Sequence, residues 1–413
     1  MNAAAQHLSR RMAVLVFLAF ALAYFFSALV RAITATLSPV LTQELGLQAR
    51  DLGLLAGGYF FGFSLTQLPL GRWLDRHGPR RVILAFLSVA VLGCVAFALA
   101  DSFHGLLLAR VLCGVGVSAC LMAPLTGYRR WFNPGTQLRT NSWMLMTGSL
   151  GMVAATLPVQ WLLPVWGWRA LFLAMAVCIA LAMLGIRLLV PDWSRPVTAQ
   201  TTAADDGGYA EVWRSRYFWR MTPIGFFSYG GMVAIQTLWA GPWMTQVAGW
   251  SALEAATGLF AINLSMLTSF WIWGWVTPVL ARRGIHVNTL IARGLPLSLL
   301  ALAVLVLAGP AAGAGAAAML AAFCVTSTFV ALAQPAVGMA FPAHLAGRAL
   351  SAYNLVIFAG IFVVQWGVGL AVDLARAQGL GAVQAYQVAL GAFGLCSLLS
   401  WLFFMLFRAD NAS

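Results

Sequence analysis

The chain has very few charges and no lysine. Only 8% of its 413 residues are charged, all 24 basic residues are arginine, and 62% of the residues are hydrophobic. A soluble domain carries about a quarter of its residues as charges, so this composition excludes a soluble globular protein and predicts an integral membrane protein. The net charge of +13 could suggest a nucleic-acid-binding protein, but the arginines occur singly and in pairs and form no basic stripe.

Acidic, metal-binding and catalytic residues are also scarce. None of the 11 acidic residues and none of the five histidines falls in the middle of an apolar segment. The six cysteines have no CxxC spacing, so we expect neither disulfides nor metal ligands. The chain has no nucleotide-binding loop motif and no assignable nucleophile–base pair. These absences predict a protein without metal or cofactor that is neither an enzyme nor driven directly by ATP.

Glycine, proline and arginine divide the chain into long apolar stretches. A helix needs about 20 mostly apolar residues to cross a bilayer, and no stretch alternates with the period of two that a membrane barrel requires. We therefore predict an all-α integral membrane protein with twelve spanning helices. Their predicted ranges are 13–36, 52–74, 81–101, 104–128, 140–163, 168–190, 220–243, 254–280, 286–308, 312–335, 346–372 and 383–407.

Arginines near the predicted helix ends alternate from loop to loop. They cluster before the first helix and after the second, fourth, eighth and tenth helices, whereas the intervening loops carry mainly acidic residues. Because basic residues accumulate in cytoplasmic loops, both termini are predicted to be cytoplasmic. We expect a multi-pass monomer in the inner (plasma) membrane, surrounded by lipid and without a nucleic-acid partner.

A dense charge cluster at residues 71–81 separates the second and third predicted helices. It reads Gly-Arg-Trp-Leu-Asp-Arg-His-Gly-Pro-Arg-Arg. This run resembles the Gly-x-x-x-Asp-Arg-x-Gly-x-Arg-Arg signature of the major facilitator superfamily of transporters. The resemblance implies the fold of that superfamily, with two six-helix halves. It also implies a conformational latch, whose acid pairs with an arginine or caps a helix; the alternative is a turn that only sets topology. The latch residues would be Gly71, Asp75, Arg76, Gly78, Arg80 and Arg81.

A degenerate copy of this cluster occurs 206 residues later, where Leu, Arg and Gly recur in register between Thr277 and Gly284. The repeat predicts a six-helix bundle over 1–190, a cytoplasmic linker over 191–219 and a second bundle over 220–413. Within the linker, we expect residues 209–218 to form a short amphipathic helix on the membrane surface. Its Trp213 and Phe218 would face lipid.

One candidate charge lies inside the first predicted helix. Helical spacing places a polar stripe on one face: Tyr24, Ser27, Arg31, Thr34 and Ser38. A charge inside the bilayer costs about 2.5–3.5 kcal/mol on insertion scales and is therefore a functional candidate. We predict that Arg31, with Tyr24 and Ser27, lines a water-filled substrate path. The alternative is that Arg31 only reaches out to the interface, if the helix ends near Pro39.

A second arginine lies early in the fourth predicted helix. The Arg-x-x-x-Gly-x-Gly spacing of Arg110, Gly114 and Gly116 resembles the helix-4 motif of the superfamily, with Cys113 where glutamine is usual. Small residues let helix backbones approach closely. Arg110 is then either a charge that contacts substrate in the cavity or a clamp on neighbouring carbonyl groups.

Two arginines without a buried acid predict an electropositive cavity. Guanidinium groups bind carboxylate and phosphate through two parallel hydrogen bonds. The chain also resembles the organic-anion-transporting branch of the superfamily, through Arg31, Arg110 and the run Arg-Arg-Trp-Phe at 129–132. That branch often has an acid beside the helix-1 arginine and another within helix 4, where this chain has Val30 and Val117 or Ser118. The departure leaves the coupling mechanism open.

The second half supplies uncharged polar and aromatic candidates. A stripe on the seventh helix includes Gln236 and Trp239, and Gly241-Pro242 is expected to kink or unwind that helix. Helix 8 offers a further amide, and helix 11 offers two amides eleven residues apart on one face: Asn263, Asn354 and Gln365. Such groups build an orienting pocket for a substrate. The alternative for each of them is packing between helices.

The combined prediction is a secondary transporter that works by alternating access. Its expected substrate is a small organic anion of the carboxylate type, moved by symport, with the proton as one candidate coupling ion. One alternative is an efflux pump for drugs or other metabolites, favoured by the aromatic and methionine content. An alternative of a different class is a membrane-embedded sensor that binds ligand without transporting it.

Overall fold

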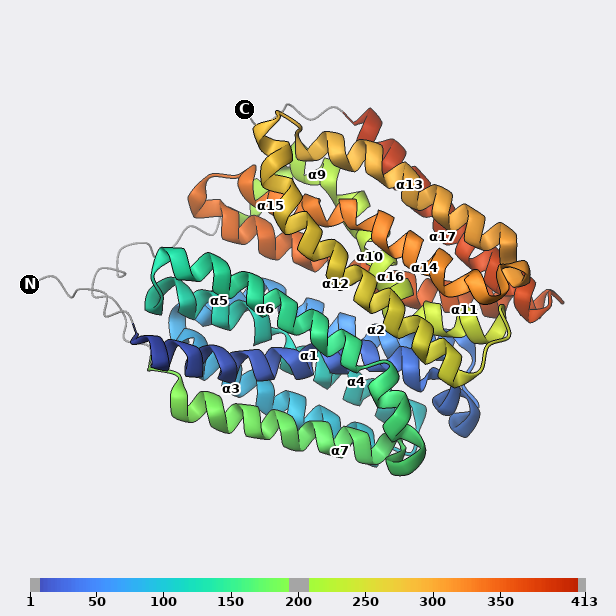
Figure 1. Ribbon diagram of the computed structural model, residues 1–413, viewed down its shortest axis with the longest axis horizontal. Helices are drawn as coiled ribbons and strands as arrows, with labels where there is room; N and C mark the ends of the chain where they lie inside the picture. Colours follow the sequence, from blue (N-terminus) through green and yellow to red (C-terminus); the bar gives the residue numbers. More distant parts are fainter. Residues whose placement is uncertain (1–7, 193–207, 408–413) are drawn as a thin grey trace, which may run out of the picture.

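The computed structural model describes residues 8–192 and 208–407, and within these ranges its regular secondary structure is entirely helical. Eight helical segments are long and apolar enough to cross a membrane on their own. In Figure 1 the helices of the N-terminal half, blue to green, fill the lower part of the molecule, and those of the C-terminal half, yellow to red, fill the upper part.

Seven helices make up the N-terminal half. They are α1 (Arg10–Leu45), α2 (Ala49–Leu65), α3 (Gln67–Leu99), α4 (Phe103–Val117), α5 (Ala119–Trp131), α6 (Pro134–Ala154) and α7 (Leu157–Leu189). Both α3 and α7 are broken by a glycine in the left-handed region, Gly78 (φ 77°) and Gly167 (φ 68°). Each therefore contributes the end of one span and the whole of the next. With α4 continuing into α5, these helices form six spans.

The C-terminal half begins with short segments. They are α8 (Gly208–Arg214), α9 (Arg216–Pro223), η2 (Ile224–Tyr229), α10 (Gly230–Ala234), η3 (Ile235–Trp239) and α11 (Ala240–Gln246). The remaining elements are α12 (Ala252–Arg282), α13 (Val287–Ala308), η4 (Gly309–Gly315), α14 (Ala316–Ser327), η5 (Thr328–Leu332), α15 (Ala333–Met339), α16 (Ala343–Ala377) and α17 (Ala382–Leu406). Segments α9 to α11 form one span, and α14 to α15 form another. The described parts of the chain thus contain twelve spans, as predicted.

The internal repeat is visible in the backbone. Gly78 (φ 77°) and its counterpart Gly284 (φ 72°) both turn the chain through the left-handed region, which only glycine enters without a steric cost. Gly46 (φ 64°) and Gly249 (φ 73°) form a second such pair, after the first span of each half. The sequence echo therefore reflects two similarly folded halves.

Two predictions about the connection between the halves need correction. Residues 209–218 do not form one helix, because α8 ends at Arg214 and the side chain of Ser215 caps α9. Phe218 does not face lipid: its side chain is fully buried and packs edge-on against the ring of Tyr353. Residues 193–207 of the predicted linker lie outside the described residues, so its boundaries stay a prediction.

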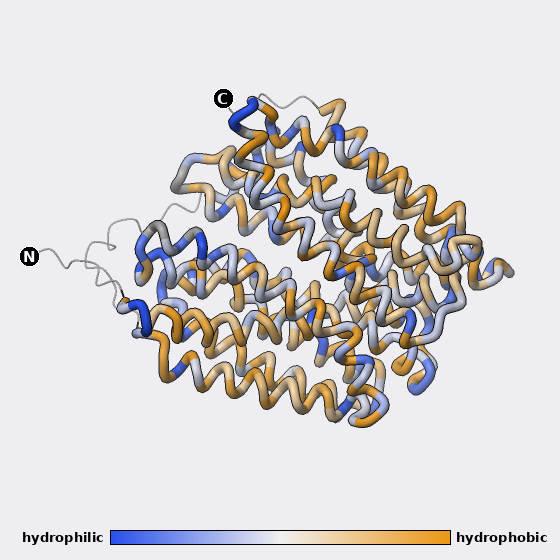
Figure 2. The backbone as a smooth tube through the Cα atoms, viewed as in Figure 1, coloured by the Kyte–Doolittle hydropathy of each residue, from blue (hydrophilic) through white to orange (hydrophobic). Residues whose placement is uncertain are grey.

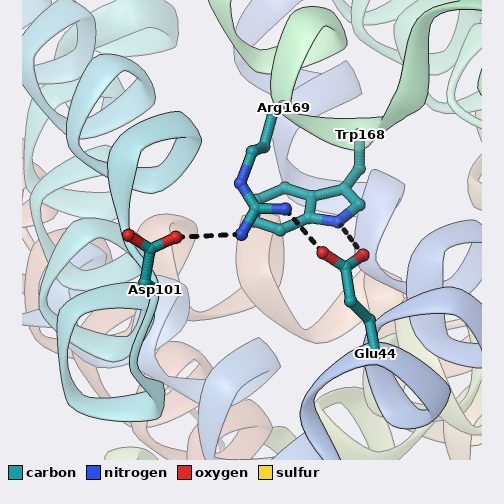
Figure 3. A network of polar contacts seen from close by, with 4 residues as sticks. All are labelled: Glu44, Asp101, Trp168 and Arg169. Carbon is teal, nitrogen blue, oxygen red and sulfur yellow. Dashed lines mark hydrogen bonds and ion pairs between the residues drawn. The ribbon is translucent and has the colours of Figure 1, made fainter.

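The two ends of the bundle differ in how they are held together. At the end that contains the 71–81 cluster, here called the motif end, Arg80 pairs with Asp192 at 2.7 Å. At the opposite end, here called the far end, Arg169 bridges Glu44 (2.6 Å) and Asp101 (3.1 Å), as Figure 3 shows. The Trp168 indole also donates to Glu44. These contacts tie together the helix ends of the N-terminal half.

The halves themselves meet along α2 and α16. The Asp373 carboxylate, near the end of α16, accepts hydrogen bonds from the backbone amides of Ala49 (3.2 Å) and Arg50 (2.9 Å) at the start of α2. A Cβ atom at Gly53 would overlap the carbonyl of Gln365, so the two backbones are in direct contact there. The halves are therefore interlocked at the far end.

Candidate functional site

The guanidinium of Arg31 lies among aromatic and hydroxyl groups. Its polar neighbours are the phenols of Tyr24 and Tyr59 and, from the C-terminal half, the phenol of Tyr229. Its Cζ atom lies 5.8 Å from the centre of the Phe63 ring. The side chain is partly exposed, while its Nε atom is buried without a hydrogen-bond partner. No ion pair of Arg31 occurs within residues 8–192 and 208–407. A charge in this setting has capacity left to bind an anion.

The length of α1 decides between the two interpretations of Arg31. The helix does not end near Pro39: it continues through this proline to Leu45, where Gly46 caps it. Arg31 is therefore 14 residues from the far end of α1 and 21 from its start. At a rise of 1.5 Å per residue, it lies about 21 Å from the nearer helix end. This depth disfavours the alternative in which Arg31 reaches the interface.

Arg110 has a different environment. Its side chain is fully buried, and its Nη1 atom donates a hydrogen bond of 2.9 Å to the carbonyl of Val30 on α1. Its Cζ atom also lies 5.1 Å from the centre of the Tyr59 ring. The Nε and Nη2 atoms are buried and make no hydrogen bond. In this conformation Arg110 acts as a clamp between α4 and α1, and it does not reach a solvent-accessible path.

Tyr59, on α2, connects these two arginines. Its ring lies against Arg110, its hydroxyl is close to Arg31, and the same hydroxyl donates a bond of 3.3 Å to the carbonyl of Ser27. Sequence reasoning missed this residue because the predicted polar stripe followed α1 alone. A signal was present: Tyr59 is the only residue with a polar side chain between Leu52 and Phe63.

Glycines bring the helices of this site together. A Cβ atom at Gly114 would overlap the carbonyl of Tyr59, and one at Gly116 would overlap the backbone of Ala90. This confirms the prediction that small residues of the fourth helix allow close backbone approach. The Sγ atoms of Cys94 and Cys113 lie 3.9 Å apart beside Arg110. Cys113 occupies the position where the superfamily motif usually has glutamine.

The polar groups of the C-terminal half are mostly paired with one another. Gln236 donates to Asn263 at 3.0 Å, and Gln334 donates to Asn354 at 2.6 Å. These contacts correspond to the packing interpretation of the amides.

Gln365 and Asn354, which the sequence placed on one face of α16, have different hydrogen-bond partners. The Gln365 side-chain amide donates to the hydroxyl of Thr237 at 3.0 Å, and the backbone carbonyl of Gln365 accepts a bond of 3.1 Å from the Trp239 indole. The side-chain Oε1 of Gln365 is buried without a hydrogen-bond partner. Asn354 turns instead to α15. The two amides have different neighbours because α16 passes successive elements of its own half.

The seventh span unwinds earlier than predicted. Gly241-Pro242 lies inside the regular helix α11, and the irregular turn η3 precedes it as a π-helix. Because Pro242 has no amide hydrogen, the carbonyl of Leu238 loses its usual i+4 donor, which favours the wider turn. Gln236 and Trp239 thus sit on the irregular turn itself.

The residues of the predicted latch occupy the motif end. Arg80 bonds to Asp192 and to the carbonyl of Arg187 (2.7 Å each), and the exposed Asp75 faces Arg129. These partners all belong to the N-terminal half. Gly78 supplies the left-handed turn of the motif.

Comparison with known proteins shows two kinds of similarity. The chain is 24% identical over 289 residues to the hexuronate transporter of Escherichia coli strain K12. The aligned region covers 66% of this chain and 66% of that protein. It is 26% identical over 158 residues to the 4-hydroxybenzoate transporter PcaK of Acinetobacter baylyi, covering 38% of this chain and 34% of that protein. The chain spans about half the length of the curated relatives it matches.

The matches that define the fold and the family cover more of the chain than those relatives do. A bacterial homologue of the human lysosomal transporter Spinster, solved in an inward-facing and unoccupied conformation, superposes with a TM-score of 0.80 at 17% identity, covering 96% of this chain and 97% of the other. The family model described as the Major Facilitator Superfamily matches residues 20–365, most of the chain. These findings confirm a multi-pass membrane fold of two six-helix halves, and the chain belongs to the Major Facilitator Superfamily.

Proposed function

We propose that this protein is a secondary transporter that moves a small organic anion by alternating access around Arg31. The observation that carries the proposal is a guanidinium deep in the membrane that is partly exposed and has no acidic partner within the described residues. An unpaired charge at this depth is costly, and an anionic substrate compensates it during transport.

The surroundings of Arg31 suit a carboxylate attached to an apolar or hydroxylated body. The guanidinium supplies two parallel donors, and the hydroxyls of Tyr24 and Tyr59 lie beside it. Phe63 packs against Phe358 of the other half, with 4.2 Å between ring centres, and forms an aromatic wall. Hexuronate and 4-hydroxybenzoate, named for two relatives, are both carboxylates of this general kind.

The other predicted residues take supporting roles in this proposal. Arg110 adds positive potential and holds α1 in place through the Val30 carbonyl. The polar and aromatic candidates of the C-terminal half hold together the helices that face Arg31. They are Gln236, Trp239, Asn263, Asn354 and Gln365. Ser27 has a buried hydroxyl oxygen without a partner and becomes available to substrate when the helices move.

The contacts between the halves support alternating access. The structure is interlocked at the far end by α2 and α16, so substrate enters from the motif end in this state. In the opposite state the Asp373 contacts separate, and the residues of the 71–81 cluster engage across the halves as a latch. We place the motif end, with both termini, in the cytoplasm of an inner-membrane protein that acts as a monomer, with residues 191–219 joining its two bundles.

The test is uptake of radiolabelled 4-hydroxybenzoate and a hexuronate into proteoliposomes, with and without a proton gradient. Arg31→Gln should lower uptake about 100-fold, because a pair of charged hydrogen bonds contributes about 3 kcal/mol. Arg31→Lys keeps the positive charge but loses the two parallel donors of the guanidinium. Its uptake rate should therefore lie between those of the wild type and Arg31→Gln. The matched control is Arg216→Gln, which removes an exposed arginine at the start of α9.

Three outcomes would contradict the proposal. Anion uptake by a folded Arg31→Gln protein at the wild-type rate would exclude Arg31 as the binding charge. Export of neutral aromatic compounds that is insensitive to this substitution would favour an efflux pump. Saturable anion binding without any flux in either direction would favour a sensor.

A further inference from the structure

A cavity of about 680 Å³ lies at the motif end, away from Arg31 and between α1 and α6. These two helices run next to each other on the viewer's side of Figure 1. The cavity is lined by residues from the start of α1, the end of α5 and the first turns of α6: Leu8, Arg10, Ala13, Val14, Phe17, Leu18, Trp131, Phe132, Asn133, Thr136, Arg139, Thr140 and Trp143. The transport mechanism proposed above uses none of these residues.

The lining of the cavity changes from charged at the motif end to apolar deeper along the two helices. Arg10 and Arg139 are exposed near the motif end, where Figure 2 shows hydrophilic helix ends. Deeper along the same two helices, Val14, Leu18 and Trp143 are 50%, 55% and 55% exposed. Leu18 lies eight residues beyond Arg10, about 12 Å along the helix. Large apolar side chains this exposed in a membrane protein face the acyl chains of the bilayer.

The polar end of the cavity is positive. Its lining contains two arginines and no acid, and neither arginine has an ion-pair partner in the part of the chain that the structure describes. Helices α1 and α6 both begin here, and their N-terminal amides add partial positive charge. The Asn133 side chain makes no capping bond to the α6 amides. The polar end therefore has donors available for an anionic group.

We propose that this cavity binds one anionic phospholipid of the cytoplasmic leaflet. Its phosphate lies between Arg10 and Arg139, and one acyl chain runs along Val14, Leu18 and Trp143. A soluble anion would satisfy only the charged end, and an apolar metabolite only the deeper end. A phospholipid matches both ends in the order in which the bilayer presents them, and basic pockets between helices on the cytoplasmic side suit such headgroups.

Occupation of the cavity couples lipid to the helix that carries Arg31. The lipid would bridge the start of α1 to the start of α6, and the rings of Phe17 and Trp143, 6.5 Å apart, already connect the two helices inside the cavity. A ligand that binds only the folded protein stabilises it by mass action. Anionic lipid should therefore raise the thermal stability of the purified protein, independently of any transport substrate.

The experiment measures lipid retention by native mass spectrometry and thermal unfolding in detergent, with dioleoylphosphatidylglycerol and dioleoylphosphatidylcholine as probes. Wild-type protein should retain phosphatidylglycerol in preference to phosphatidylcholine. The double variant Arg10→Gln/Arg139→Gln should retain about tenfold less phosphatidylglycerol, because each arginine near an anionic headgroup contributes a several-fold factor in affinity. The control Arg214→Gln/Arg216→Gln removes the same charge from the exposed surface of α8 and α9 and should retain the lipid.

A second variant separates the charge from the shape. Leu18→Trp fills the deeper end and keeps both arginines, so it should also lose the bound lipid, and it serves as the test if the double variant does not fold. Equal loss in the control, or equal retention of phosphatidylcholine by wild type, would show generic surface attraction and overturn the proposal. Stabilisation by glycerol 3-phosphate as strong as that by the lipid would show a soluble-phosphate site instead.

Discussion

The two halves have similar backbone folds but differ in the hydrogen bonding of their buried polar groups. The N-terminal half contains two buried or half-buried arginines with unused donor atoms, Arg31 and Arg110. The C-terminal half contains amides that are mostly paired with each other, such as Gln236 with Asn263, and its unused buried atoms belong to the neutral side chains of Trp243 and Gln365. Unused hydrogen-bonding capacity is costly in the membrane and marks a place where a ligand acts. Within the described residues, the unused groups include charged ones in the N-terminal half and only neutral ones in the C-terminal half, and this contrast supports the proposal that Arg31 binds the substrate.

Disrupting the packing of the N-terminal half should have the largest effect. Gly114→Val places side-chain atoms where the Tyr59 carbonyl lies, so α4 must move away from α2 and expose Arg110. Overpacking and the loss of the clamp together should cost about 3–5 kcal/mol of folding free energy. Thermal unfolding in detergent measures this loss. Gly391→Val is the matched control, because no atom lies within 4 Å of a Cβ at that position.

A smaller effect is expected from the amides of the C-terminal half. Gln236→Leu or Asn263→Leu alone leaves a buried partner unsatisfied, which should cost about 1–3 kcal/mol. The double variant removes both groups and should recover most of that loss. Unfolding of the four proteins in a double-mutant cycle measures the coupling. If the double variant instead abolishes anion uptake while its stability recovers, the C-terminal half binds substrate as well, and the contrast between the halves fails.

The smallest effect should come from the junction of the halves. Asp373→Asn weakens the cap on α2, and loss of a helix cap costs about 0.5–2 kcal/mol. That free energy should shift the population toward opening at the far end. Labelling of a Ser38→Cys probe on α1 by a membrane-impermeant maleimide reports the shift as a several-fold faster reaction. Asp101→Asn, which acts at the same end but within one half, should leave the labelling rate unchanged.

Much of the architecture could be read from local sequence patterns. Apolar length predicted the twelve spans, and the repeat of Gly78 at Gly284 predicted two related halves. The polar stripe of α1 identified Arg31, because all of its members lie on one helix and follow its period. The possible helix end near Pro39 was wrong, because α1 continues through this proline to Leu45. A proline does not end a membrane helix when neighbouring helices satisfy the freed backbone groups.

The partners across helices were beyond such patterns. Nothing local to Tyr59 shows that it lies between Arg31 and Arg110, and nothing local to Asp373 shows that it caps a helix more than 300 residues earlier in the chain. Hydrophobicity and turn residues are one-dimensional properties, so the sequence by itself determined the class, the spans and the buried charge. Pairing depends on which helix faces meet, and only the tertiary structure decided that Arg31 stays available while Arg110 is used as a clamp.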